Sequence, residues 1–86
     1  MSIPLSVLIV EDYENDALLI VEELENGGIE PVLERVETVE AMKKALDSHA
    51  WDIVIADYVL PHFSGIAALE LARQRDPDIP FILISG

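Results

Sequence analysis

The chain has 86 residues, of which 17 are acidic and 5 are basic, and its formal net charge is −12 at pH 7. So few Lys and Arg side chains argue against direct contact with nucleic acid or with an anionic membrane surface. No apolar run approaches the roughly 18 residues of a membrane-spanning helix. Apolar residues make up 51% of the chain, which suits the core of one small domain and not a disordered segment. The chain has no Cys and therefore no disulfides, so we expect a cytoplasmic protein.

The first half of the chain alternates between strand and helix patterns. Residues 5–10 are nearly all apolar and rich in β-branched side chains, which is typical of a strand buried on both faces of a parallel sheet. Residues 14–26 carry apolar side chains at helical spacing, and Gly27 and Gly28 follow as a stop signal. Residues 32–36 alternate apolar and charged side chains, which predicts an edge strand.

The second half of the chain repeats this alternation. Thr38 is predicted to cap a second helix that has Met42 and Leu46 on its apolar face. The patterns then predict a buried strand, a turn, a third helix and a final strand, at residues 53–56, 61–65, 66–75 and 81–84 respectively. Strands that alternate with helices in this way imply a parallel sheet covered on both faces, so we predict a doubly wound α/β fold.

Polar side chains follow three of the predicted strands. Glu11 and Asp12 come after the first strand, Asp57 after the third and Ser85 after the fourth. In an open parallel sheet, ligand sites form beyond the carboxyl ends of the strands. If the first and third strands are neighbours, three carboxylates and one hydroxyl meet in a single crevice.

Carboxylates gathered in this way need a cation. Their mutual repulsion amounts to about 4 kcal/mol per pair near a protein surface, and Mg²⁺ offsets it while keeping sites for water and phosphate oxygens. A neighbouring Asp can then act as a nucleophile toward a phosphoryl group. Taken singly, each acid also has a structural explanation, because Glu11 and Asp12 precede a helix and Asp57 suits a turn. Their joint placement at the strand ends favours the metal site.

Four segments resemble the receiver domains of two-component response regulators. They are Val-Leu-Ile-Val-Glu-Asp at 7–12, Asp-Ile-Val-Ile-Ala-Asp-Tyr-Val-Leu-Pro at 52–61, Ser64-Gly65, and Ile-Leu-Ile-Ser-Gly at 82–86. The resemblance extends over the whole chain and implies the flavodoxin-like strand order 2-1-3-4. It also implies a phosphoacceptor signalling domain rather than an enzyme.

The resemblance assigns a role to each polar strand end. It implies that Asp57 accepts a phosphoryl group from a phosphohistidine, and that Glu11, Asp12 and Asp57 hold Mg²⁺ together with the backbone carbonyl of Val59. Ser85 is implied to hydrogen-bond the phosphoryl oxygens and to couple phosphorylation to a change of surface. By the same likeness, Pro61 and Gly65 shape the loop after Asp57, with a role in geometry rather than chemistry.

The family has a further helix, strand and helix after the position of Ser85, and that strand carries a Lys that contacts the phosphoryl group. On this comparison, residues 1–86 are expected to be the N-terminal, incomplete part of a receiver domain. The strand predicted at 81–84 then exposes an apolar edge. This predicts either a longer protein or a homodimer formed through that edge.

Two functions stay open. The first is a Mg²⁺-dependent phosphoacceptor, with a sensor histidine kinase and a downstream effector domain or protein as partners. The second is a phosphorylation-independent interaction module, favoured by the lack of a matching Lys, since Lys43 and Lys44 lie on the predicted second helix. A phosphohydrolase is disfavoured because Val59, two residues after Asp57, offers no second carboxylate as a general acid.

Overall fold

The computed structural model describes residues 3–58, 60, 61 and 63–84. Within them, strands and helices alternate as β1 Ile3–Val10, α1 Glu14–Asn26, β2 Ile29–Val36, α2 Val39–Ser48, β3 Ile53–Asp57, α3 Gly65–Arg75 and β4 Phe81–Ile84. The strands form one parallel sheet in the order β2-β1-β3-β4. The predicted α/β class and the strand order 2-1-3-4 are confirmed. No helix in the described ranges is long and apolar enough to cross a membrane.

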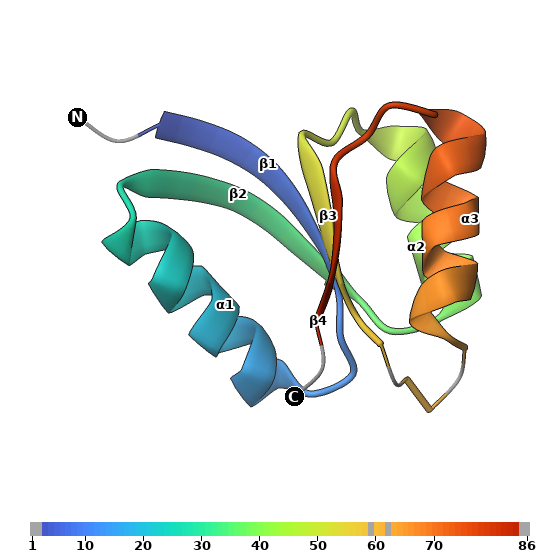
Figure 1. Ribbon diagram of the computed structural model, residues 1–86, viewed down its shortest axis with the longest axis horizontal. Coiled ribbons are helices and arrows are strands. Elements are labelled where there is room, and N and C mark those ends of the chain that lie inside the picture. Colours follow the sequence, from blue (N-terminus) through green and yellow to red (C-terminus); the bar gives the residue numbers. More distant parts are fainter. Residues whose placement is uncertain (1–2, 59, 62, 85–86) are drawn as a thin grey trace.

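The sheet separates two helical layers, with α1 on one face and α2 and α3 on the other (Figure 1). Successive side chains of a strand point to opposite faces, so β1 contributes to both layers. Val7 and Ile9 belong to the apolar cluster that packs against α1. Leu8 and Val10 belong to the larger cluster, which includes buried side chains of α2 and α3. The nearly uninterrupted apolar run of β1 is therefore explained by burial on both faces.

The helix boundaries follow local chemistry. The hydroxyl of Thr38 accepts a hydrogen bond from the backbone N–H of Ala41 at 3.1 Å, which confirms the predicted cap of α2. Ser64 caps α3 in the same way, through the N–H of Ala67 at 3.0 Å. Gly28, which follows the C-cap Gly27 of α1, has φ = 85°, a conformation that glycine adopts without steric cost.

The first two strands are longer than the sequence pattern indicated. β1 begins at Ile3 and β2 at Ile29, and these two residues are partners in the parallel register. Hydrogen bonding along this pair extends the strands beyond the segments that show a clear apolar pattern. β2 lies at an edge of the described sheet and is mostly exposed, as its alternation predicted.

Met42 is the largest fully buried side chain that α2 contributes to the core. We expect Met42→Ala to lower the free energy of unfolding by about 2–4 kcal/mol, because it leaves a cavity between α2 and the sheet. The exposed neighbour Lys43 provides the control, and Lys43→Ala is expected to change stability by less than about 0.5 kcal/mol. Urea denaturation measures both, and equal midpoints for the two variants would contradict this packing.

Candidate functional site

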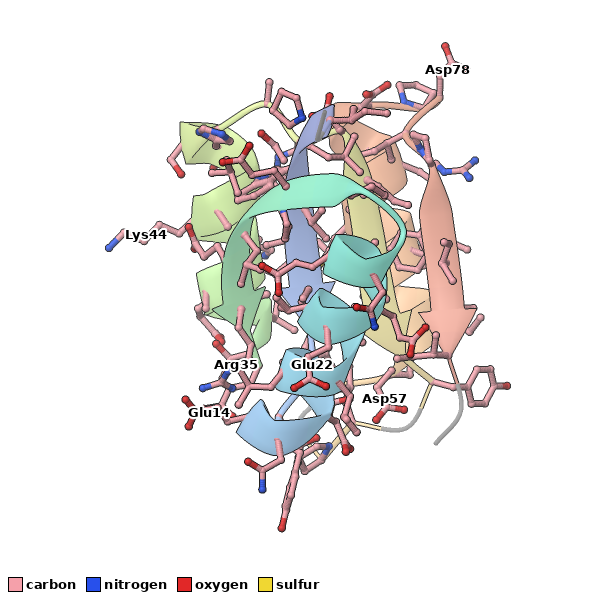
Figure 2. The ribbon with its side chains drawn as sticks, turned by 90° about the vertical axis from the view of Figure 1, so that its left-hand side faces the viewer. Glu14, Glu22, Arg35, Lys44, Asp57 and Asp78 are labelled. Carbon is pink, nitrogen blue, oxygen red and sulfur yellow. The ribbon has the colours of Figure 1, made fainter. Side chains whose placement is uncertain are left out.

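Three acidic side chains meet beyond the carboxyl ends of β1 and β3. Glu11 and Asp12 follow β1, Asp57 is the last residue of β3, and the register pairs Val10 with Ala56 just before them. One carboxylate oxygen from each of the three lies within 4.8 Å of the others. Figure 2 shows Asp57 at this end of the sheet, where the strand arrows point. The structure thus brings together three of the five predicted site residues.

The other two predicted site residues, Val59 and Ser85, lie outside the described residues, so the carbonyl and hydroxyl roles expected of them stay predictions.

Helix capping and turn formation, the alternative roles considered for these acids, explain their positions less well than a shared metal site does. The N-cap of α1 is Tyr13, and its side chain makes no capping hydrogen bond. Glu14 and Asp16 occupy the first turn of α1, where acids favour the helix dipole, but neither belongs to the three-carboxylate cluster. Asp57 lies within β3 and pairs with Ile84 of β4, so it is a strand residue rather than a turn residue.

Glu11 is the buried member of the cluster. Its side chain is buried, with 2% of the residue exposed, and its Oε1 accepts a hydrogen bond from the N–H of Tyr13 at 3.1 Å. Its backbone N–H donates to the carbonyl of Val36 at 3.0 Å. Its backbone carbonyl accepts from Nη1 of Arg35 at 3.1 Å. These bonds anchor the segment after β1 to the end of β2.

The pKa of Glu11 is raised from 4.5 to about 7, mainly by burial and also by hydrogen bonds with the carboxyl groups of Asp12 and Asp57. The hydrogen bond from the Tyr13 N–H acts in the opposite direction, because it favours the charged form. The charge of Asp57 adds to the rise through direct repulsion. A cation bound among these carboxylates would offset this repulsion and favour the charged form of Glu11.

The raised pKa of Glu11 makes the fold less stable as pH increases. The folded state holds this proton more tightly than the unfolded state, so the stabilisation is complete below pH 4.5 and is lost as pH rises through about 7. We expect a decrease on the order of 2–3 kcal/mol in the free energy of unfolding across this window in metal-free buffer. Urea denaturation at several pH values measures it. Glu11→Gln should flatten the dependence, whereas Glu22→Gln, an exposed change on α1, should leave it as steep as in the parent chain.

Gly65 positions α3 against the end of β3. Its N–H donates to the carbonyl of Tyr58 at 3.3 Å. A Cβ at this position would come within 2.7 Å of both the carbonyl oxygen of Asp57 and a methyl group of Leu83, and within 3.1 Å of the Tyr58 Cα. Only glycine allows the helix to start so close to the backbone of Asp57, which supports the geometric role expected of Gly65.

Arg35 is a site residue that the sequence did not reveal. Besides its bond to the Glu11 carbonyl, its Nη1 lies 3.6 Å from a carboxylate oxygen of Glu37. The sequence shows a basic residue inside an alternating strand, but this pattern does not identify a partner 24 positions away. The contact follows from the pairing of β1 with β2.

Comparison with known proteins shows which family and which relatives this chain resembles. The family model described as response regulator receiver domain matches residues 7–86. The chain is 34% identical over 83 residues to sensor kinase CckA of Brucella abortus (strain 2308), an alignment that covers 94% of this chain and 9% of CckA. The chain thus spans a small fraction of that relative's length.

Two of the solved structures that share the fold carry a bound group. The MaeR response regulator bound to beryllium trifluoride superposes with a TM-score of 0.79 at 29% identity, covering 100% of this chain and 68% of that one. The receiver domain of sensor histidine kinase PA1611 from Pseudomonas aeruginosa PAO1 has a magnesium ion coordinated in its active-site cleft. It superposes with a TM-score of 0.75 at 21% identity, covering 93% of this chain and 66% of that one.

Proposed function

Because the chain belongs to the response regulator receiver domain family, we propose that Asp57 accepts a phosphoryl group from a phosphohistidine of a sensor histidine kinase, in a reaction that requires Mg²⁺. The observation that carries the proposal is the convergence of Glu11, Asp12 and Asp57 from two neighbouring strand ends. The magnesium ion in the PA1611 receiver domain and the beryllium trifluoride bound to MaeR support it.

The donor set fits a hard divalent cation. Glu11, Asp12 and Asp57 offer carboxylate oxygens, the ligand type that Mg²⁺ prefers, and Glu11 is buried while the other two are half-buried. These three residues would hold the ion, with the carbonyl of Val59 as a further proposed ligand. The bound ion would supply positive charge to the phosphoryl oxygens during transfer.

The residues of this chain then account for the transfer. A carboxylate oxygen of Asp57 attacks phosphorus and forms an acyl phosphate, while the bond between phosphorus and the kinase histidine nitrogen breaks. The electron pair of that bond stays on the imidazole, which takes up a proton. Because position 65 is glycine, α3 begins directly beside the backbone carbonyl of Asp57. The Ser85 hydroxyl is proposed to donate a hydrogen bond to the phosphoryl oxygens.

Incubation with acetyl phosphate, a small phosphodonor, tests the proposal. With Mg²⁺ we expect intact-mass spectrometry to show addition of one phosphoryl group that is lost in acid or hydroxylamine. Chelation with EDTA is expected to prevent the addition. If the folded protein has the same mass with and without the phosphodonor in the presence of Mg²⁺, the phosphorylation-independent interaction module is favoured instead.

We extend the proposal to partners and location. The phosphodonor is a sensor histidine kinase and the output is a downstream effector domain or protein, in the cytoplasm, without direct contact to nucleic acid or membrane. The net charge of −12 supports these exclusions.

Within the described sheet β4 pairs with β3 alone, and Ile82 of β4 is 46% exposed, which supports protein association at this edge. Sedimentation velocity tests a homodimer, and a monomer at high concentration would count against it.

A further inference from the structure

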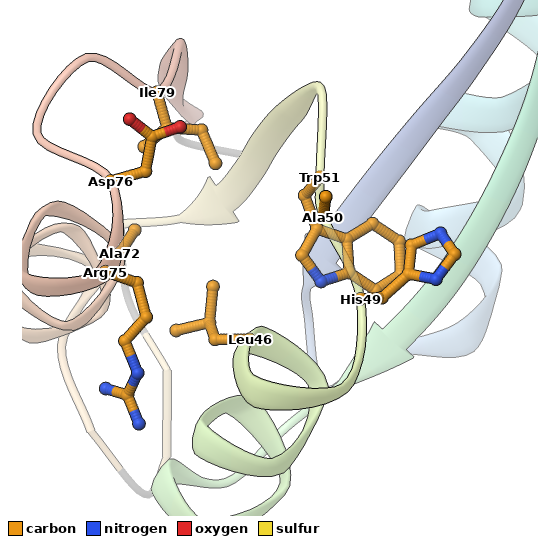
Figure 3. A pocket seen from close by; sticks show the side chains of 8 residues that line it. All are labelled: Leu46, His49, Ala50, Trp51, Ala72, Arg75, Asp76 and Ile79. Atoms are coloured by element: carbon orange, nitrogen blue, oxygen red, sulfur yellow. The ribbon is translucent and has the colours of Figure 1, made fainter.

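A cavity lies at the end of the molecule opposite the acidic cluster. It has a volume of about 380 Å³ and is bordered by the C-terminal ends of α2 and α3 and by the segment that leads into β3 (Figure 3). Its apolar lining includes the buried side chains of Leu46, Ala72 and Ile79. This volume falls in the range of sites that bind small organic molecules.

An indole forms one wall of this cavity. Trp51 lines it, and the indole Nε1–H donates to the carbonyl of Ala45 at 3.0 Å, which fixes the orientation of the ring. The imidazole of His49 packs against the indole, with ring centroids 4.8 Å apart and an angle of 52° between the planes. The wall is thus aromatic and held in one orientation, and the face of an indole attracts cations.

The charges around the cavity favour a positive ligand. Arg75 also lines the cavity, but its Nε donates to Oδ1 of Asp47 at 2.9 Å, so this pair contributes little net charge. Asp76 adds a carboxylate to the lining, held in place by a hydrogen bond from the N–H of Asp78 to its Oδ1 at 3.1 Å. In Figure 3, Asp76 and Arg75 lie across the cavity from Trp51.

Two further features strengthen this negative potential. α2 ends at the cavity and has no basic residue in its last turn, so the partial negative charge of its terminal carbonyls is not offset within the helix. The last turn of α3 does carry Arg73 and Arg75, which donate hydrogen bonds to the carbonyl of Pro77 and to Asp47 respectively. The whole chain carries −12, which raises the local concentration of cations around it.

We propose that this cavity binds a small organic cation, an ammonium group carried on an apolar body. The apolar body would contact Leu46, Ala72 and Ile79, while the ammonium group would lie between the indole of Trp51 and the carboxylate of Asp76. The inference does not rest on the phosphoacceptor chemistry, because the residues involved and the end of the sheet are different.

The chain contains one Trp, so its fluorescence reports on this cavity directly. Titration with phenethylammonium is expected to change the Trp51 fluorescence in a saturable way. The anion 3-phenylpropionate has a similar apolar body with the opposite charge, and it is expected to give no saturable change. A linear, collisional response to phenethylammonium, or equal binding of both compounds, would overturn the proposal.

Matched variants test the role of the carboxylate. Asp76→Asn is expected to weaken phenethylammonium binding by about three- to fivefold, because it removes the charge and keeps the side-chain size. Asp78→Asn, an equal change of charge two residues away and outside the lining, should leave the affinity within about 1.5-fold. Shifts of the Trp51 indole N–H signal in ¹⁵N-resolved NMR spectra provide a second readout. Equal affinities of the two variants would refute the site.

Discussion

Replacing Asp57 by Asn is expected to abolish phosphoryl transfer to this chain. The amide of Asn offers no anionic oxygen to attack phosphorus, so incorporation from acetyl phosphate should fall by more than about 100-fold. Asn is close to Asp in size, and position 57 is half-buried at the end of β3, so the fold should persist. Intact-mass spectrometry of the acid-labile adduct measures the loss, and circular dichroism checks that the variant is folded.

The control for this experiment is another acid near the site. Asp16 lies in the first turn of α1 and is exposed, outside the three-carboxylate cluster. Asp16→Asn removes the same charge with the same change of atoms, and we expect labelling close to that of the parent chain. Undiminished labelling of the Asp57→Asn protein would place the phosphoacceptor elsewhere and contradict the proposed function.

The second large effect is expected on the stability of the fold, when Gly65 is replaced by Ala. The new methyl group would lie 2.7 Å from the carbonyl oxygen of Asp57 and 3.1 Å from the Cα of Tyr58. These are backbone atoms, which cannot rotate away as the end of a flexible side chain can. We expect the free energy of unfolding to decrease by about 2–3 kcal/mol, at the upper end of the usual cost of overpacking. Urea denaturation measures the change.

Gly27→Ala provides the matched control, because Gly27 is also a glycine at a helix end. Its φ is −83°, and an added Cβ would meet its nearest neighbours at 3.5 and 3.6 Å, which is ordinary contact. A change between zero and about 1 kcal/mol of stabilisation is expected, since Ala reduces the freedom of the unfolded chain. If the two variants have the same stability, the close approach at Gly65 does not constrain the fold.

The Gly65 variant also connects packing with function. One of the atoms that the methyl group would meet belongs to Asp57, so the strain falls on the backbone that carries the phosphoacceptor. We expect Gly65→Ala to label more slowly with acetyl phosphate than Gly27→Ala, even under conditions in which both proteins are fully folded. Equal labelling rates would show that the strain relaxes away from the site.

Local sequence patterns predicted much of the fold. The predicted bounds of the first helix, 14–26, match α1, since apolar periodicity and two following glycines both depend on neighbouring residues. Thr38 was identified as a cap for the same reason. The starts of β1 and β2 were placed too late, because the pairing of Ile3 with Ile29 joins residues that are distant in the chain.

The acidic cluster could be predicted because the carboxyl ends of parallel strands share one edge of a sheet. Glu11, Asp12 and Asp57 each follow or end an apolar strand, so the sequence indicated which residues could meet there. The order of the strands did not follow from periodicity and came from the family resemblance. The structure confirms that β1 and β3 are neighbours.

The sequence therefore determined the fold class and the set of acids, because these depend on local periodicity and on the chemistry of strand ends. Tertiary structure alone decided the burial that raises the Glu11 pKa, the anchoring of its carbonyl by Arg35, and the cavity beside Trp51. Each of these depends on distances between segments far apart in the chain. Such distances are determined by packing across the sheet, which no run of neighbouring residues encodes.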